Sequence, residues 1–364
     1  MEPPAHLTSR RQRKIWEQQQ KDNAAKRHKP HHDPFRTLER HFKAPHPSME
    51  DVIDLHAPHD KLIAVPLAHP LTSDVFGPQI TSQTAYIVKD IPGLIVIPNP
   101  FSPEAQRAMI AQCLTDFARP PNTSNHDAFF KIPETGLWPL YVAEQSGAKS
   151  IPTVPPKEKS QGAFLANSLL SPTDMLRKQR WVTLGYQYHW GTKEYDLERD
   201  IKVPSTVGEM AVDVVTAIQG IGGEGWTNSY QANDFAAEAG VINYYQIKDT
   251  LMAHVDKSEL NMEAPLVSAS FGLSCIYLLG GPTKETPPVA LRLSSGDIIV
   301  MTGACRKAYH GVPRILEGTL PDYLGSDAFG DQLDGELLGK WMNSTRINLN
   351  IRKVFPSSTS LETP

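Results

Sequence analysis

The sequence STRINLNIRK at residues 344–353 alternates apolar and polar side chains with a period of two, which predicts a β-strand. One face of this strand is apolar, with Ile347, Leu349 and Ile351. The other face carries two arginines and two asparagines: Arg346, Asn348, Asn350 and Arg352. Such a polar face is usually solvated in an antiparallel sheet, and the alternative is that it lines a cavity that holds an anion.

The chain around this strand, from about residue 240 onward, is rich in short strand patterns separated by Gly and Pro. These stretches are GVINYYQI, LVSASFGLSCIYLLGG, VALRL, GDIIVMTG, AYHGVPRIL and TRINLNIRKV. Upstream, residues 94–97 predict a buried strand, Ser102 and Pro103 predict the start of a helix, and Thr206 with Glu209 predicts a capping box on another. We therefore predict an α+β protein with an all-β, jelly-roll core and flanking helices.

The N-terminal part of the chain differs in composition from the β-rich half. Residues 1–43 hold eleven Lys or Arg against five Asp or Glu, with RRQRK at 10–14 and KRHKPHH at 26–32. We predict a basic, largely flexible arm over residues 1–85, with one helix around 10–21. It is either a solvated tail, or an arm that contacts phosphates or directs nuclear import. Residues 86–180 would form a shell with a loop-rich insertion at 118–178, residues 181–355 the core, and 356–364 a disordered tail.

Composition excludes several classes of protein. The net charge of −4 does not mark the whole chain as a nucleic-acid binder. Its three cysteines lie far apart without a CxxC pattern, so we expect neither a disulfide framework nor a cysteine zinc site. No apolar run approaches a membrane span, and the N-terminus lacks the apolar segment of a secretory signal. We expect a soluble, intracellular protein that does not contact a membrane.

A candidate metal site lies in the β-rich half, in the sequence HVDKSEL. His254 and Asp256 are two residues apart, so on a strand they point to the same face. His310 is the only histidine that follows, and it comes after a predicted strand. Two imidazoles and one carboxylate match the facial triad of non-haem Fe(II), which leaves room for a bidentate 2-oxoacid and O2.

Such a 2-oxoacid would carry a second carboxylate that needs a cation. Arg346 suits this task because its planar guanidinium makes paired, charge-assisted hydrogen bonds with a carboxylate. An arginine inside a barrel without an anion would carry a desolvation cost of several kcal/mol. The polar face of the strand at 344–353 thus has a physical reason to look into a cavity.

With these residues assembled, the sequence resembles the AlkB family of Fe(II)/2-oxoglutarate dioxygenases, most strongly its AlkB homologue 1 branch. The resemblance runs from about residue 181 to 355, and more faintly from residue 92. It rests on RWVTLGYQYHW, FAAEAGVINYYQI, HVDKSEL and SASFGLSCIYLLGG, in that order. The resemblance implies a double-stranded β-helix, the cupin-like form of the jelly roll.

The resemblance also implies roles for individual residues. His254, Asp256 and His310 would hold Fe(II). The remaining family positions would bind 2-oxoglutarate or line its pocket, and they fall on Asn243, Tyr245, Ser268, Arg346, Asn348 and Arg352. The implied reaction consumes 2-oxoglutarate and O2, yields succinate and CO2, and hydroxylates an N-methyl group that is then lost as formaldehyde.

The substrate side is less well defined. Tyr186 and Tyr188 match the family's substrate-facing strand and could stack on an extruded base, or they could simply pack on the core. Trp138 is a further stacking candidate. Ser258 stands where some members carry an acidic residue that helps to select the base, which leaves the methylated base undefined.

Three functions are open at this point. The first is a demethylase of N-methyladenine in RNA (tRNA or mRNA) or DNA, the second a protein hydroxylase or demethylase with the same iron centre, and the third an inactive jelly-roll binding module. The basic arm favours nucleic acid as the partner. We expect a monomer in the nucleus or cytoplasm, with a mitochondrial pool.

Overall fold

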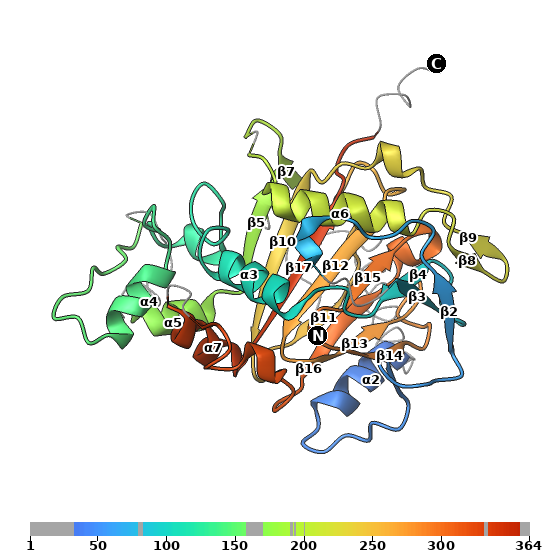
Figure 1. Cartoon of the computed structure of the whole chain (residues 1–364), viewed down its shortest axis with the longest axis horizontal. Helices are drawn as coiled ribbons and strands as arrows, with labels where there is room; N and C mark the ends of the chain where they lie inside the picture. The colour runs from blue at the N-terminus through green and yellow to red at the C-terminus, as the bar shows by residue number, and fades with distance from the viewer. Residues whose placement is uncertain are drawn as a thin grey trace, which may run out of the picture.

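Two β-sheets lie face to face at the centre of the molecule, with helices on their outer sides (Figure 1). The computed structural model describes residues 33–78, 83–157, 170–189, 192, 194–199, 201–330 and 334–356. The larger sheet has eight strands, in the order β2 (Leu62–Pro66), β3 (Thr84–Val88), β4 (Leu94–Ile97), β15 (Ile298–Met301), β12 (Leu266–Gly272), β17 (Thr345–Arg352), β10 (Ala239–Gln246) and β5 (Trp181–Gly185). The smaller sheet has five, in the order β1 (Val52–Asp54), β14 (Val289–Leu293), β13 (Cys275–Leu279), β16 (His310–Ile315) and β11 (Leu251–His254).

The remaining elements lie around these sheets. The α-helices are α2 (Pro34–Lys43), α3 (Pro103–Leu114), α4 (Trp138–Gln145), α5 (Pro172–Lys178), α6 (Ser205–Ala217) and α7 (Gly335–Met342). Two short hairpins pair β6 (Gln187–His189) with β7 (Glu194–Asp196), and β8 (Gly222–Gly223) with β9 (Trp226–Thr227). Single 3-10 turns are η1 (Asp74–Phe76), η2 (Asn125–Ala128), η3 (Ala232–Asp234), η4 (Gly303–Lys307) and η5 (Asp322–Leu324). No helix in the described ranges is long and apolar enough to cross a membrane.

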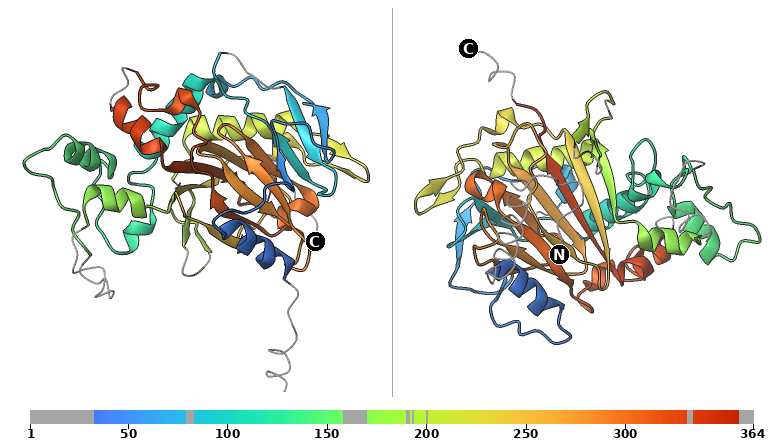
Figure 2. Two further views of the ribbon diagram at one scale, coloured as in Figure 1. Left: turned by 90° about the horizontal axis from the view of Figure 1, so that it is seen from below. Right: turned by 180° about the vertical axis from the view of Figure 1, so that it is seen from behind.

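Three apolar clusters hold the layers together. One fills the space between the sheets, with Leu94 and Val96 from the larger sheet and Leu291 from the smaller. A second joins the outer face of the larger sheet to α3 and α6, and a third joins α2 to the outer face of the smaller sheet. Figure 2 shows α6 and α2 on opposite sides of the paired sheets. This arrangement confirms the predicted jelly-roll core with flanking helices.

Strand β17 lies between β10 and β12 in the middle of the larger sheet, and all eight of its residues are buried. Its apolar residues Ile347, Leu349 and Ile351 belong to the cluster beneath α3 and α6. Because side chains alternate along a strand, its arginines and asparagines point to the other face, toward the smaller sheet. The interpretation of this face as solvated is therefore wrong.

Two predicted helix starts have different outcomes. Helix α3 begins as predicted, since Pro103 is its first residue and the Ser102 hydroxyl accepts the amide of Ala105 at 3.2 Å. The capping box on α6 is wrong, because the helix begins at Ser205 and makes no side-chain cap. The Thr206 hydroxyl instead donates to Gln112 at 3.3 Å, so a tertiary contact replaces the local one.

The prediction of a largely flexible arm up to residue 85 is wrong for its described part. Residues 33–78 include α2, β1 and β2. Phe35 and Phe42 of α2 are 0% and 2% exposed against the smaller sheet. Glu39 is also buried and accepts the amide of Ala253 in β11 at 2.8 Å. These partners lie more than 200 positions away along the chain, so the local sequence pattern could not predict that α2 packs on the sheet. The predicted helix at 10–21 lies outside the described residues.

The insertion predicted at 118–178 contains α4, α5 and η2, and its residues 158–169 lie outside the described part. Helix α4 packs through Trp138 and Tyr141 on Trp341 of α7, with ring centroids 6.4 and 5.2 Å from that of Trp341. Figure 1 shows this group of helices at one side of the sheets. Nearly all of the predicted tail, residues 357–364, is also undescribed.

The packing of α2 predicts that it is part of the folded domain. Phe42→Ala should lower the free energy of unfolding by about 3–5 kcal/mol because it removes a buried aromatic ring. Arg40→Ala, on the exposed side of the same helix, should change it by less than about 0.5 kcal/mol. Denaturant unfolding of both variants measures this. Equal stabilities would mean that α2 is not required for the fold.

Candidate active site

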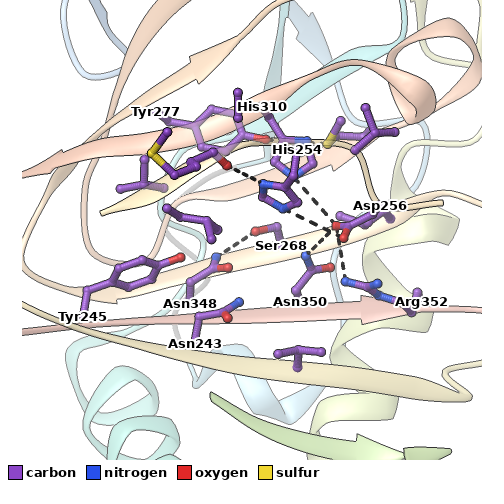
Figure 3. A pocket seen from close by; sticks show the side chains of 18 of the residues that line it. Asn243, Tyr245, His254, Asp256, Ser268, Tyr277, His310, Asn348, Asn350 and Arg352 are labelled. Atoms are coloured by element: carbon purple, nitrogen blue, oxygen red, sulfur yellow. Dashed lines mark hydrogen bonds and ion pairs between the residues drawn. The ribbon is translucent and has the colours of Figure 1, made fainter. Parts of the chain in front are cut away.

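A cavity of about 520 Å³ opens between the two sheets. Its walls come from β10, β12 and β17 of the larger sheet and from β11 and β16 of the smaller one. Figure 3 shows its polar side chains in two groups, with His254, His310 and Asp256 at one end and Tyr245, Asn348 and Asn243 nearer the other. The cavity therefore offers two chemically different ends.

The first group has the arrangement of a metal site. His254 and His310 are direct partners in the antiparallel pairing of β11 with β16, and their ring centroids are 4.3 Å apart. Asp256 follows two residues after β11 ends at His254, with carboxylate oxygens 3.9 and 3.7 Å from the two Nε2 atoms. Ligand atoms of all three lie within 4.8 Å of one another. No other such group of three occurs in the described ranges.

Hydrogen bonds fix which ring nitrogen faces the cavity. The Nδ1 atom of His254 donates to the carbonyl oxygen of Met252 at 2.9 Å, and that of His310 donates to Ala308 at 3.2 Å. A carbonyl oxygen can only accept, so the proton resides on Nδ1 and the lone pair on Nε2. Both Nε2 atoms therefore present a lone pair toward Asp256.

The protonation states also suit a cation. Burial lowers the pKa of His310 to about 4, so its imidazole is neutral near pH 7. Burial by itself would raise the pKa of the Asp256 carboxyl, but the Arg352 guanidinium beside it more than offsets this and holds the pKa well below its usual range. Two neutral imidazoles and one carboxylate are the donor set of a non-haem Fe(II) triad, so the residues present fit this metal.

The guanidinium of Arg346 marks the second end of the cavity. It lies 5.1 Å from the ring centroid of Tyr245, and its Nη2 donates to Ser270 at 2.8 Å. Its Nε and Nη1 are buried and have no hydrogen-bond partner among the described residues. A buried guanidinium with two unpaired donors carries a large desolvation cost, which a carboxylate would relieve. Arg346 thus fits the distal carboxylate of 2-oxoglutarate.

The other predicted cosubstrate residues lie on neighbouring strands of the same sheet. In the pairing of β10 with β17, Asn243 stands opposite Asn348 and Tyr245 opposite Arg346. The Asn348 amide donates to the Ser268 hydroxyl on β12 at 2.8 Å. All five side chains line the cavity. The structure thus places every residue of this predicted set along one wall.

Arg352, at the far end of β17, lies next to the metal-binding group. Its Nη2 is 3.3 Å from the Asp256 carboxylate, and the Asn350 amide donates to the same oxygen at 3.4 Å. Arg346 and Arg352 are six residues apart, or about 20 Å along a strand. One therefore serves the cosubstrate end and the other serves the metal end.

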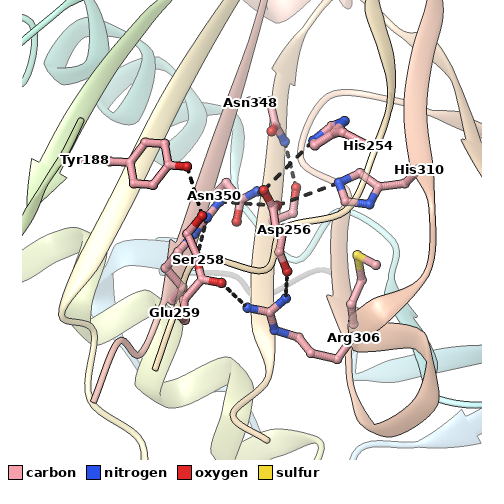
Figure 4. Close-up of polar contacts among 12 residues, drawn as sticks. Tyr188, His254, Asp256, Ser258, Glu259, Arg306, His310, Asn348 and Asn350 are labelled. Atoms are coloured by element: carbon pink, nitrogen blue, oxygen red, sulfur yellow. Dashed lines mark hydrogen bonds and ion pairs between the residues drawn. The ribbon is translucent and has the colours of Figure 1, made fainter. Parts of the chain in front are cut away.

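Two of the four predicted substrate residues line the cavity. The hydroxyls of Tyr188 and Ser258 are hydrogen-bonded at 2.9 Å (Figure 4). Tyr186 is absent from the cavity wall and packs on Phe355, with ring centroids 5.0 Å apart. The strand is interrupted at Gly185, which has a φ of +67°, so the alternation assumed for the two tyrosines does not apply.

Trp138 is the clear error among the predicted substrate residues. It is 2% exposed, packed between Tyr141 and Trp341, and does not line the cavity. It begins helix α4 and packs into the apolar cluster, so it cannot stack on a base in the cavity.

Sequence reasoning missed other residues that contact this site. They are Glu259, Arg306, Tyr195 and Ser270, together with Asn350, whose place on the polar face was seen without a role. Arg306 is 2% exposed although it is charged. Its place in the chain, between strand β15 and the metal-binding His310, could have indicated that Arg306 lies near the metal site. For its partner Glu259, the sequence offered no indication of a role other than its position next to Ser258.

Comparison with known proteins agrees with this geometry. The family model described as the 2OG-Fe(II) oxygenase superfamily matches residues 93–352. The protein called nucleic acid dioxygenase ALKBH1 from Homo sapiens is 33% identical, over 90% of this chain and 85% of its own length. The tRNA demethylase abh1 of Schizosaccharomyces pombe is 35% identical, over 73% of this chain and 80% of its own length. The DNA N(6)-methyladenine demethylase ALKBH1A of Arabidopsis thaliana is 30% identical, over 76% of this chain and 79% of its own length.

The unpaired donors of Arg346 give a prediction for the cosubstrate. Arg346→Lys keeps the positive charge but loses the paired geometry, so the KM for 2-oxoglutarate should rise well beyond about tenfold. Succinate formation at increasing 2-oxoglutarate concentration measures it. Arg180→Lys, at an arginine outside the cavity wall, is the matched control and should leave this KM unchanged. A wild-type KM in Arg346→Lys would exclude the proposed carboxylate contact.

Proposed function

The chain belongs to the 2OG-Fe(II) oxygenase superfamily, and we propose that it oxidatively demethylates N-methylated bases, N-methyladenine first among them, in nucleic acid. Members of this family use Fe(II), 2-oxoglutarate and O2. Bound iron supplies the oxidation of the methyl group, in which 2-oxoglutarate is consumed to succinate and CO2. The demethylated base and formaldehyde are the remaining products.

One observation carries the enzymatic part of the proposal. The metal-binding group and the guanidinium of Arg346, whose Nε and Nη1 have no partner among the described residues, line one cavity from opposite sheets. In the proposed reaction His254, Asp256 and His310 hold the metal, and Arg346 orients the cosubstrate by its distal carboxylate. An inactive binding module would have no need for this combination, because both groups carry a desolvation cost without their ligands.

Two observations support nucleic acid as the substrate. The names of the relatives from human, fission yeast and Arabidopsis all refer to nucleic acid, tRNA or DNA. In addition, helix α2 brings cations to the rim of the cavity. Arg36 and Lys43 both contact the sulfur of Met252, at 3.6 and 3.4 Å, and Met252 lines the cavity while remaining 47% exposed. Cations beside the opening suit a phosphate backbone whose base enters the cavity.

The substrate can be narrowed only in part. The relatives' names divide between RNA and DNA, so we keep both, with tRNA or mRNA as the RNA substrate. Tyr188 and Ser258 are the side chains we propose to contact the base, since both line the cavity beside the metal-binding group. The second candidate function is hydroxylation or demethylation of a protein, for which no described contact argues. We further propose that the protein is a monomer and that it resides in the nucleus or cytoplasm, with a mitochondrial pool. The basic stretches at 10–14 and 26–32 suit a nuclear import signal.

The proposed reaction can be tested with methylated oligonucleotides. The wild-type protein, given Fe(II), 2-oxoglutarate and O2, should release succinate and formaldehyde in equal amounts from an RNA or DNA strand that contains N-methyladenine. Asp256→Ala removes the only carboxylate of the metal group and should abolish both products, while circular dichroism shows a folded chain. Succinate without formaldehyde from every methylated strand, but formaldehyde from a methylated protein, would favour the second candidate. Undiminished succinate from Asp256→Ala would overturn the metal assignment.

The position of α2 gives a prediction about salt. The variant Lys43→Gln should weaken binding of a methylated strand and reduce the slope of log K against log salt by about 0.7–0.9 for each phosphate that this cation neutralises. Its turnover of a free methylated nucleoside should stay unchanged. Whole-helix deletion is unsuitable because Phe35 and Phe42 are part of the core. An unchanged slope would mean that α2 contacts no phosphate.

A further inference from the structure

Glu259 lies behind the metal-binding group and accepts hydrogen bonds from three side chains. Its side chain is 0% exposed. The donors are the guanidinium of Arg352 at 2.6 Å, that of Arg306 at 2.8 Å, and the hydroxyl of Tyr195 at 2.9 Å. Burial by itself would raise the pKa of the Glu259 carboxyl, but Arg352 and Arg306 more than offset this and lower it. Glu259 is therefore an anion between two buried cations.

Both of these arginines also bind Asp256. Arg352 reaches the carboxylate of Asp256 at 3.3 Å (Figure 3), whereas Arg306 donates to its main-chain carbonyl at 2.7 Å (Figure 4). Arg306 is in turn anchored on the carbonyl of Ala264 at 3.3 Å. Asp256 is thus held at two points, on its side chain and on its main chain. Glu259 joins the two arginines that hold it.

The same carboxylate connects the metal group to the β6–β7 hairpin. Tyr188 and Tyr195 are direct partners in this hairpin, with ring centroids 5.2 Å apart. Tyr195 donates to Glu259, and Tyr188 is hydrogen-bonded to Ser258. The hairpin is therefore hydrogen-bonded to Ser258 and Glu259, two and three residues after Asp256. A displacement of the hairpin would pull on the loop that carries the metal carboxylate.

We propose that Glu259 is a positioning residue, which holds Asp256 in its metal-binding orientation through Arg352 and Arg306 and ties that orientation to the β6–β7 hairpin. The inference rests on the proposed metal site. A cluster of buried charges is often no more stabilising than apolar residues of the same volume. Stability is therefore a weak reason for this cluster, whereas orientation of a metal ligand is a direct one, because hydrogen bonds to a ligating carboxylate tune the metal's affinity.

The test uses Mn(II) alone, titrated into the full chain without 2-oxoglutarate and followed by the electron paramagnetic resonance signal of free Mn(II). Glu259→Gln keeps the size of the side chain but removes its charge, so the Kd for Mn(II) should rise about 10–100-fold. Tyr195→Phe removes a single donor to Glu259 and should raise the Kd about threefold, with a circular dichroism spectrum like that of the wild type. If Glu259→Gln does not fold, Tyr195→Phe decides the question.

The control is Glu144→Gln. Glu144 accepts the amide of Thr173 at 2.9 Å and so joins α4 to α5, away from the cavity wall. This variant should lower the unfolding temperature and leave the Kd for Mn(II) unchanged. If the folded variants at 259 and 195 bind Mn(II) like the wild type, Glu259 has only a structural role and the proposal is overturned. If the wild type itself does not bind Mn(II), the metal site fails and the inference fails with it.

Discussion

Two arginines of one strand, Arg346 and Arg352, are buried between the sheets and decide which groups must surround them. Strand β17 lies in the middle of a sheet with both faces covered, so Arg346 and Arg352 cannot reach bulk water. Each needs an anion nearby, because an unpaired buried charge costs several kcal/mol. Arg352 has two anions, Glu259 and Asp256. Arg346 has none among the described side chains, so the protein is left with one guanidinium that only a ligand satisfies.

The two sheets divide the work between them. The histidines come from paired strands of the smaller sheet, with Asp256 just beyond, and Arg346 comes from the larger sheet. The apolar cluster between the sheets fixes how far apart these walls lie. A core substitution that shifted one sheet would therefore alter the reach between metal and guanidinium without touching either. The packing of the sandwich is in this sense part of the active site.

Much of the site was predictable from the sequence, and the exceptions have a common cause. The polar face of β17 follows from the period of two along a strand, and His310 follows because it is the only histidine after His254. His254 and Asp256 were correctly grouped, but Asp256 lies beyond the end of β11, so the period of a strand does not explain their proximity. What failed depended on contacts distant along the chain. Helix α2 was predicted as part of an arm because its partners on the smaller sheet cannot be seen locally, and Trp138 was misplaced because α7 lies some 200 residues further on. Tyr186 failed for a local reason, the break at Gly185. Glu259 and Arg306 acquire a role only once the fold brings them together.

Helix α2 also has a consequence for how the protein tolerates shortening. Strand β11, which ends in His254, is the outermost strand of the smaller sheet, and the Glu39 carboxylate accepts one of its amides. Uncovered border strands are templates on which other chains can add a strand of their own. A truncated chain that starts after α2 would therefore expose an aggregation-prone edge strand next to the metal-binding group. Intermolecular strand addition there would cost solubility, and it would bury the entrance to the cavity as well.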